Sequence, residues 1–193
     1  MSGATGSVAV LTPTLPSRRW LLDEAEASVA AQTYERCEHL VGVDAGREGP
    51  ASVRNRLAAS SGADWFLPLD DDDLLDPEAV EALVSASEGA DVVVPWCRVV
   101  DFVDFVDLEP WTPNRLFRPE TLLLYNFVPV TALVRAELWH GVGGMPEGVE
   151  VEDWRFWLRC LGAGARFRVV SEVLWSYRRG MSGSRNQWAA RAA

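Results

Sequence analysis

A run of four aspartates, residues 70–73, is the part of the sequence whose side chains could most directly carry out chemistry. It follows the apolar segment 65–69, which has the composition of a buried strand. Adjacent ionised carboxylates repel one another unless water, a cation or basic side chains compensate them. Magnesium and manganese ions take oxygen ligands, often one or two carboxylates together with water and substrate phosphates. The run therefore predicts a divalent-metal site, and the alternative is a solvated acidic loop.

The segments around the acids alternate between strand and helix patterns. Short apolar runs predict buried strands over residues 7–11, 40–44, 65–69 and 92–94, with Thr12 and Pro13 ending the first. Helices are expected between them: one capped by Ser17, one over 51–60, and one over 77–87 capped by Asp76. Such alternation is typical of an α/β fold with a mostly parallel central sheet flanked by helices. Ligands of these sheets bind beyond the carboxyl ends of the strands, where the acids lie.

The second half of the chain shows a looser pattern. It predicts a helix that begins at Pro119, a buried strand, a further helix and two short strands, over residues 119–125, 128–134, 151–161, 167–170 and 173–177. We therefore expect a Rossmann-like N-terminal half and a mixed C-terminal half.

Size and charge exclude several classes of protein. A chain of 193 residues with 48% hydrophobic residues fits one compact domain. A net charge of -10 argues against free nucleic acid as a partner, because no basic excess is available to contact phosphates. The longest apolar stretch, 122–134, is too short and too polar for a membrane span, and we expect a cytoplasmic location. The three cysteines have no metal-ligand spacing and are expected to be reduced core thiols.

Three segments resemble family 2 glycosyltransferases with the GT-A fold, in the order in which that family has them. They are residues 52–77, with Arg54, Asn55, Gly62 and the aspartates; residues 143–147, with Gly143 and Gly144; and residues 152–154, with Glu152 and Asp153. The resemblance ends near Tyr177 and Arg178 and spans nearly the whole chain. It implies one GT-A domain with a nucleotide-sugar-binding half over about 7–96, an acceptor and catalytic half over about 97–180, and a tail over 181–193.

The resemblance also implies the residues that hold the donor, a nucleotide diphosphate sugar expected to be UDP-linked. Asp72 and Asp73 correspond to the contacts of a Mn²⁺ or Mg²⁺ ion, as in the family's DXD motif. The nucleotide-sugar-binding positions are Pro13, Thr14, Asp44, Arg54, Asp70, Asp72, Gly144 and Arg178. Asp71 is expected to be a spacer.

On the acceptor side, Asp153 matches the family's general base and Glu152 its acidic neighbour. A sugar hydroxyl is a poor nucleophile, so a carboxylate within hydrogen-bond reach must take its proton as it attacks. A single displacement then inverts the sugar. The expected acceptor is a sugar, a protein or a small molecule.

Two departures from the family and two other hypotheses remain open. Asp44 is not followed by the second acid that often contacts the base, and Arg178-Arg179 is not followed by the family's histidine. The acids could alternatively serve a magnesium-dependent nucleotidyltransferase or phosphohydrolase. The chain could also be a nucleotide-sugar-binding module without turnover.

Overall fold

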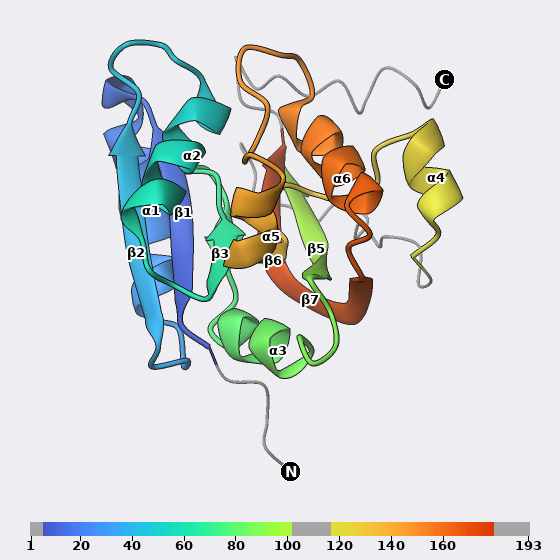
Figure 1. The fold of residues 1–193 in the computed structure, drawn as a ribbon. Helices are drawn as coiled ribbons and strands as arrows, with labels where there is room; N and C mark the ends of the chain where they lie inside the picture. Colours follow the sequence, from blue (N-terminus) through green and yellow to red (C-terminus); the bar gives the residue numbers. More distant parts are fainter. Residues whose placement is uncertain (1–5, 102–116, 180–193) are drawn as a thin grey trace.

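A computed structural model describes residues 6–101 and 117–179 of the chain, and the segment 181–193 lies outside these ranges. A seven-stranded mixed sheet forms its centre, with strand order β2-β1-β3-β6-β5-β7-β4 (Figure 1). The strands are β1 (Val8–Thr14), β2 (Cys37–Val43), β3 (Trp65–Pro68), β4 (Leu74–Leu75), β5 (Val92–Asp101), β6 (Leu133–Arg135) and β7 (Phe167–Arg179). The helices are the 3₁₀ helix η1 (Pro16–Arg18) and α1 (Arg19–Ala30), α2 (Pro50–Ser60), α3 (Ala79–Ser85), α4 (Pro119–Leu124), α5 (Ala136–Gly141) and α6 (Glu152–Gly162).

The long ladders of the sheet are parallel. β1 pairs in parallel with β2 over its whole length and with β3 from Val8 to Leu11, and β5 pairs in parallel with β7. The short β6 joins the two halves through antiparallel pairs with β3 and β5. The α/β class, the parallel N-terminal half and the mixed C-terminal half are therefore as predicted.

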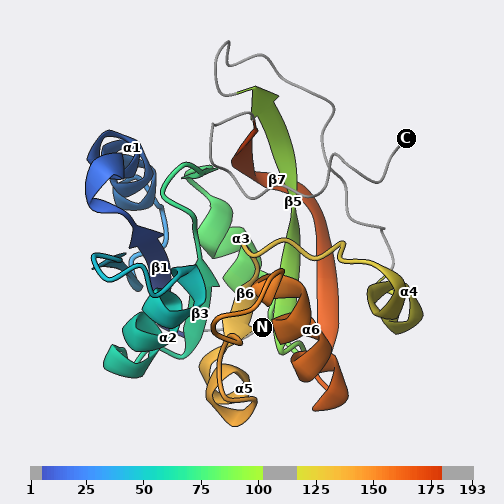
Figure 2. The ribbon, with the colours of Figure 1, turned by 90° about the horizontal axis from the view of Figure 1, so that it is seen from above.

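Two hydrophobic cores cover the two faces of the sheet. Alternate strand residues such as Ala9 and Leu11 pack with residues of α2, α5 and α6 on one face. Their neighbours Val8 and Val10 pack with α1 and α3 on the other face, and Figure 2 shows these helix groups on opposite sides of the strands. Because successive strand side chains point to opposite faces, fully apolar runs are what a sheet covered on both sides requires.

The first strand runs further than predicted, because Pro13 does not end it. β1 continues to Thr14, and Pro13 pairs in register with Gly42 of β2. The Leu11 carbonyl points toward β3, where it accepts from Leu69 N–H, so the backbone nitrogen of residue 13 faces the same side. β3 pairs with β1 only as far as Pro68. The missing N–H of Pro13 therefore costs no ladder hydrogen bond.

Two predicted helix caps are wrong. Ser17 lies within η1, and α1 begins at Arg19 without a side-chain cap. Leu21, Leu22, Ala25 and Val29 are nevertheless buried on α1 as its helical spacing predicts. α3 is shorter than predicted, and the residue before it, Glu78, makes no side-chain cap. The carboxylate of Asp76, the predicted cap, instead lies 3.8 Å from Arg98. The backbone of Asp76 is held by β7 instead, since its N–H donates to the Leu174 carbonyl at 2.9 Å.

The second half differs from the prediction in three places. A strand was expected over residues 128–134, but only the short β6 at its end pairs with other strands. The residues before β6 pack against α6, where Trp157 Nε1 donates to the Val128 carbonyl at 3.1 Å. The two expected C-terminal strands form one strand, β7, in which residues 171–172 bulge between the partners of Pro95 and Trp96. The short α5 was not predicted.

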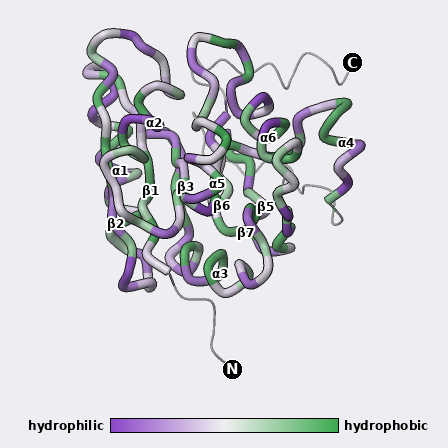
Figure 3. Tube along the Cα trace, viewed as in Figure 1, coloured by the Kyte–Doolittle hydropathy of each residue, from purple (hydrophilic) through white to green (hydrophobic). Residues whose placement is uncertain are grey.

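The apolar residues outside the cores gather in part on α4. Leu123 and Leu124 are exposed, and α4 is partly coloured as hydrophobic in Figure 3.

Within residues 6–101 and 117–179, no helix has both the length and the apolar character needed to cross a membrane.

Candidate active site

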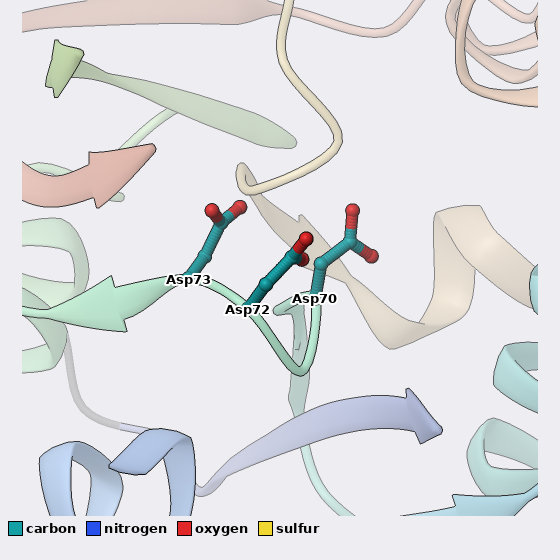
Figure 4. A group of neighbouring side chains, drawn as sticks. All are labelled: Asp70, Asp72 and Asp73. Carbon is teal, nitrogen blue, oxygen red and sulfur yellow. The ribbon is translucent and has the colours of Figure 1, made fainter. Parts of the chain in front are cut away.

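The aspartate run forms the turn between β3 and β4, at the carboxyl end of β3. The Asp73 N–H donates to the Asp70 carbonyl at 3.1 Å, which closes the turn. Carboxylate oxygens of Asp70, Asp72 and Asp73 lie within 4.8 Å of one another, and Figure 4 shows the three side chains on the same side of the turn. Three hard oxygen donors at this spacing fit a magnesium or manganese ion that keeps water and phosphate oxygens as its other ligands.

Asp71 is not a spacer, contrary to the prediction from sequence. Its buried carboxylate accepts the Thr14 hydroxyl at 2.6 Å and both Nε and Nη2 of Arg18, at 3.0 and 2.7 Å. It thereby ties the acidic turn to the end of β1 and to η1. The hydroxyl of Thr14, a predicted donor contact, is engaged in this network.

Burial and mutual repulsion perturb the two predicted metal ligands. Burial, together with the charge of Asp70, raises the pKa of Asp72 to about 6, although Arg18 lies 2.9 Å away. Burial raises the pKa of Asp73 well above its usual range, and the charge of Asp72 adds to this; the Arg178 N–H, which donates to Asp73 at 3.0 Å, opposes it. Acids that resist ionisation together are stabilised as carboxylates by a bound cation.

Arg54 connects the acidic turn with the start of α6. This arginine of α2 is only 2% exposed; it donates to Asp70, and its Nη1 lies 3.8 Å from Glu152. In the described part of the chain its Nε has no hydrogen-bond partner. A buried guanidinium shared by two acids holds the first turn of α6 beside the aspartate run, and it brings the predicted residues Arg54, Asp70 and Glu152 together.

The predicted base, Asp153, lies in the first turn of α6. Its two oxygens accept the Trp154 N–H at 2.7 Å and the Asn126 amide at 2.8 Å. Burial raises its pKa to about 6; the charge of Glu152 adds to the shift, and the two hydrogen bonds and Arg54 oppose it. Val151, just before the helix, has a φ of 56°, a conformation that valine rarely adopts. Strained backbone of this kind is concentrated at functional sites.

Three further predicted donor contacts, Asp44, Pro13 and Arg178, make contacts within the fold itself. The Asp44 carboxylate accepts the N–H groups of Glu48 and Gly49 at 2.7 and 2.9 Å, and so shapes the loop before α2. Pro13 is buried within β1. Arg178 is 3% exposed, and its guanidinium pairs with Glu24 of α1.

Gly144 packs directly against Asn55 of α2. It has a φ of 71°, and a Cβ there would overlap the side-chain oxygen of Asn55. That oxygen accepts the Met145 N–H at 2.8 Å, and the Asn55 amide donates to the Met145 carbonyl, also at 2.8 Å. Gly144 thus lets the loop before α6 seat on α2.

Gly144→Ala should lower the free energy of unfolding by about 2–3 kcal/mol, because it adds an overlap with Asn55 to the cost of a positive φ. The matched control is Gly148→Ala, at a φ of 67° with nothing within 4 Å of the new Cβ, which should cost only about 1 kcal/mol. Urea unfolding of both variants measures the difference. Equal losses would show that the contact with Asn55 is not restrictive.

Two residues of the site were not found from sequence. Arg18 could have been suspected as a basic residue just after the first strand, at the edge of the sheet where the acids lie. Asn126 is a polar interruption in the apolar stretch 122–134, and it is buried. A buried amide requires hydrogen-bond partners, which was the available signal.

Residues 43–135 match the sequence model of the family described as Glycosyl transferase family 2. This segment belongs to glycosyl transferase family 2. The matched family 2 segment holds Asp44, Arg54 and the whole aspartate run, whereas Glu152, Asp153 and Arg178 follow it. No curated protein matches the chain.

Solved structures share the fold of this chain over most of its length. The crystal structure of S. aureus TarS 1-349 has a TM-score of 0.71 at 19% identity, and covers 89% of this chain and 60% of its own. The crystal structure of the same TarS segment with UDP has a TM-score of 0.71 at 19% identity, and the match covers 90% of this chain and 61% of the TarS chain. The structure with UDP-GlcNAc has a TM-score of 0.72 at 16% identity, and the match covers 91% of this chain and 59% of the TarS chain. This chain therefore spans about three-fifths of the TarS 1-349 chain and has its GT-A-like fold.

Proposed function

We propose that this protein is an inverting glycosyltransferase that moves a sugar from a nucleotide diphosphate sugar, with UDP as the nucleotide, to an acceptor hydroxyl. The observation that carries the proposal is the link through Arg54 between three clustered acids suited to a metal and the turn that holds Asp153. The family 2 match supports glycosyl transfer, and the complexes of TarS with UDP and UDP-GlcNAc support the choice of nucleotide.

On the donor side, Asp70, Asp72 and Asp73 would hold Mn²⁺ or Mg²⁺. A cation bound there neutralises the negative charge that builds on the departing diphosphate. Arg54 fixes Asp70 in place, and Asp71 anchors the turn through Arg18 and Thr14. The N-terminal half would thus bind the donor, as proposed for residues 7–96.

On the acceptor side, Asp153 takes the proton of the attacking hydroxyl as its oxygen bonds to the anomeric carbon. A pKa of about 6 leaves this carboxylate mostly ionised at neutral pH and more basic than an ordinary aspartate, which suits a general base. The bond between the anomeric carbon and the diphosphate breaks on the opposite side, so the sugar is inverted. A sugar, a protein or a small molecule as acceptor, and a cytoplasmic location, stay predictions from the sequence.

A panel of nucleotide sugars tests this proposal. Purified protein with Mn²⁺ and candidate acceptors should release UDP from a UDP-sugar in step with glycosylation of an acceptor, and chelation with EDTA should abolish the release. Release of sugar phosphate or of inorganic pyrophosphate would instead indicate a phosphohydrolase or a nucleotidyltransferase. Donor binding without any release across the panel would indicate a binding module.

A further inference from the structure

Asn126 lies between α4 and β6 and contacts the predicted base directly. It is 5% exposed, and its Nδ2 donates to Asp153 Oδ2 at 2.8 Å. Its Oδ1 accepts the Val128 N–H at 3.2 Å. The segment that follows is fixed by buried contacts, including the hydrogen bond from Trp157 of α6 to the Val128 carbonyl. Asn126 therefore joins a rigid segment to the carboxylate of Asp153.

The contact with Val128 fixes which end of the Asn126 amide faces Asp153. A backbone N–H can be accepted only by the amide oxygen, so the NH₂ group must point to the carboxylate. An NH₂ group can only donate, and it therefore matches the ionised form of Asp153. The other carboxylate oxygen already accepts the Trp154 N–H at 2.7 Å. Each oxygen of Asp153 thus has a fixed donor.

We propose that Asn126 is a positioning residue that holds the Asp153 carboxylate ionised and in one orientation, ready to take the proton of the acceptor hydroxyl. This inference rests on the proposed role of Asp153 as the base. Asn126 acts through Asp153 and does not itself react.

The groups around Asp153 have opposing effects on its ionised form. Burial favours the neutral acid, and Glu152 on the same helix adds to this, whereas Asn126 and Arg54 favour the carboxylate. Arg54 is shared with Asp70 on the donor side. α4, which packs against α6, contributes Glu120, and this residue is exposed. The Trp154 N–H and the Asn126 amide are therefore the two neutral donors that stabilise the ionised base, and Asn126 is the one supplied by a side chain.

The experiment is a carboxyl ¹³C NMR titration of the full chain, with the Asp153 signal assigned through Asp153→Asn. Wild-type Asp153 should titrate near pH 6. In Asn126→Ala the midpoint should rise by roughly 1–2 pH units, since a hydrogen bond to a charged group contributes about 1.5–3 kcal/mol. The matched control is Thr131→Val, because the buried Thr131 hydroxyl in the same segment has no hydrogen-bond partner among the described residues. Its midpoint should not move.

A second variant guards against a folding defect. Asn126→Asp keeps the shape and can still accept the Val128 N–H, but it presents a carboxylate to Asp153, so the midpoint should rise at least as far. An unchanged midpoint in folded Asn126→Ala or Asn126→Asp would overturn the inference. Because the titration needs no turnover, it decides the point even if the proposed function fails.

A kinetic measurement tests whether the contact matters for transfer. With UDP-GlcNAc and Mn²⁺ as the probe, the acidic limb of kcat for UDP release should move upward in Asn126→Ala by the same amount as the NMR midpoint, with KM for the donor unchanged. A uniform fall in kcat at every pH would show a merely structural role and overturn the inference. Absence of UDP release in the wild type with every donor would contradict the proposed function alone.

Discussion

Asp153→Asn should lower kcat for sugar transfer by roughly 100- to 10,000-fold, because the amide cannot take the proton of the acceptor hydroxyl. Binding of UDP should be unchanged, since Asp153 lies in α6 and is not among the clustered acids. The substitution keeps the size of the side chain and can still accept the Trp154 N–H. Steady-state kinetics and UDP titration together measure the effect.

The same residue gives the transfer reaction a defined pH dependence. The pKa of Asp153 is raised to about 6, so the base is ionised above that pH and protonated below it. Transfer should therefore be nearly full at pH 7.5 and fall about tenfold per pH unit well below pH 6. In Asp153→Asn the residual rate should not show this acidic limb.

The matched control is Glu137→Gln, which also removes an acid from the first turn of a helix but at an exposed position on α5. It should leave both kcat and the pH profile unchanged. Full activity of folded Asp153→Asn, or an equal loss in the control, would contradict the assignment of the base.

Asp71→Ala should be among the most destabilising substitutions in the donor half. It leaves the half-buried Arg18 without its bidentate partner and the buried Thr14 hydroxyl without its carboxylate acceptor. Breaking a buried ion pair on one side typically costs about 3–5 kcal/mol. Arg18 is partly exposed and keeps Asp72 at 2.9 Å, so the expected loss is about 2 kcal/mol. Urea or thermal unfolding measures it.

The control for Asp71→Ala is the same substitution in an exposed pair. Asp23 contacts Arg19 at 2.8 Å, but both side chains are more than half exposed, so Asp23→Ala should change stability by less than about 0.5 kcal/mol. Should Asp71→Ala prove as stable as Asp23→Ala, Asp71 would be the spacer that the sequence predicts.

The sheet and the place of the acids could be predicted because they depend on local patterns. Short apolar runs such as residues 65–69 are typical of buried strands in a sheet covered on both faces, and a charged run that follows such a strand is expected at the edge of the sheet. The helical spacing of apolar residues likewise predicted the buried face of α1. The prediction was wrong at Pro13 and Asp76, where pairing with distant segments decided the outcome.

The roles of individual polar residues were harder to predict because they depend on contacts across long sequence distances. Asp71 meets Arg18, 53 residues away, and Asn126 meets Asp153, 27 residues away. Asp44 and Arg178 stay predicted donor contacts, and the structure adds a role for each within the fold, with the N–H of Glu48 and with Glu24. Residue type alone does not distinguish an acid that binds substrate from one that anchors a turn.

Calorimetric titration of UDP into the protein, with and without Mn²⁺, tests most directly whether the clustered acids form a metal-dependent nucleotide site. UDP should bind tightly only with Mn²⁺ present, and Asp73→Asn should weaken that binding to the metal-free level because it removes one of the three clustered carboxylates. Equal UDP affinity with and without Mn²⁺, or unchanged metal dependence in folded Asp73→Asn, would contradict the account.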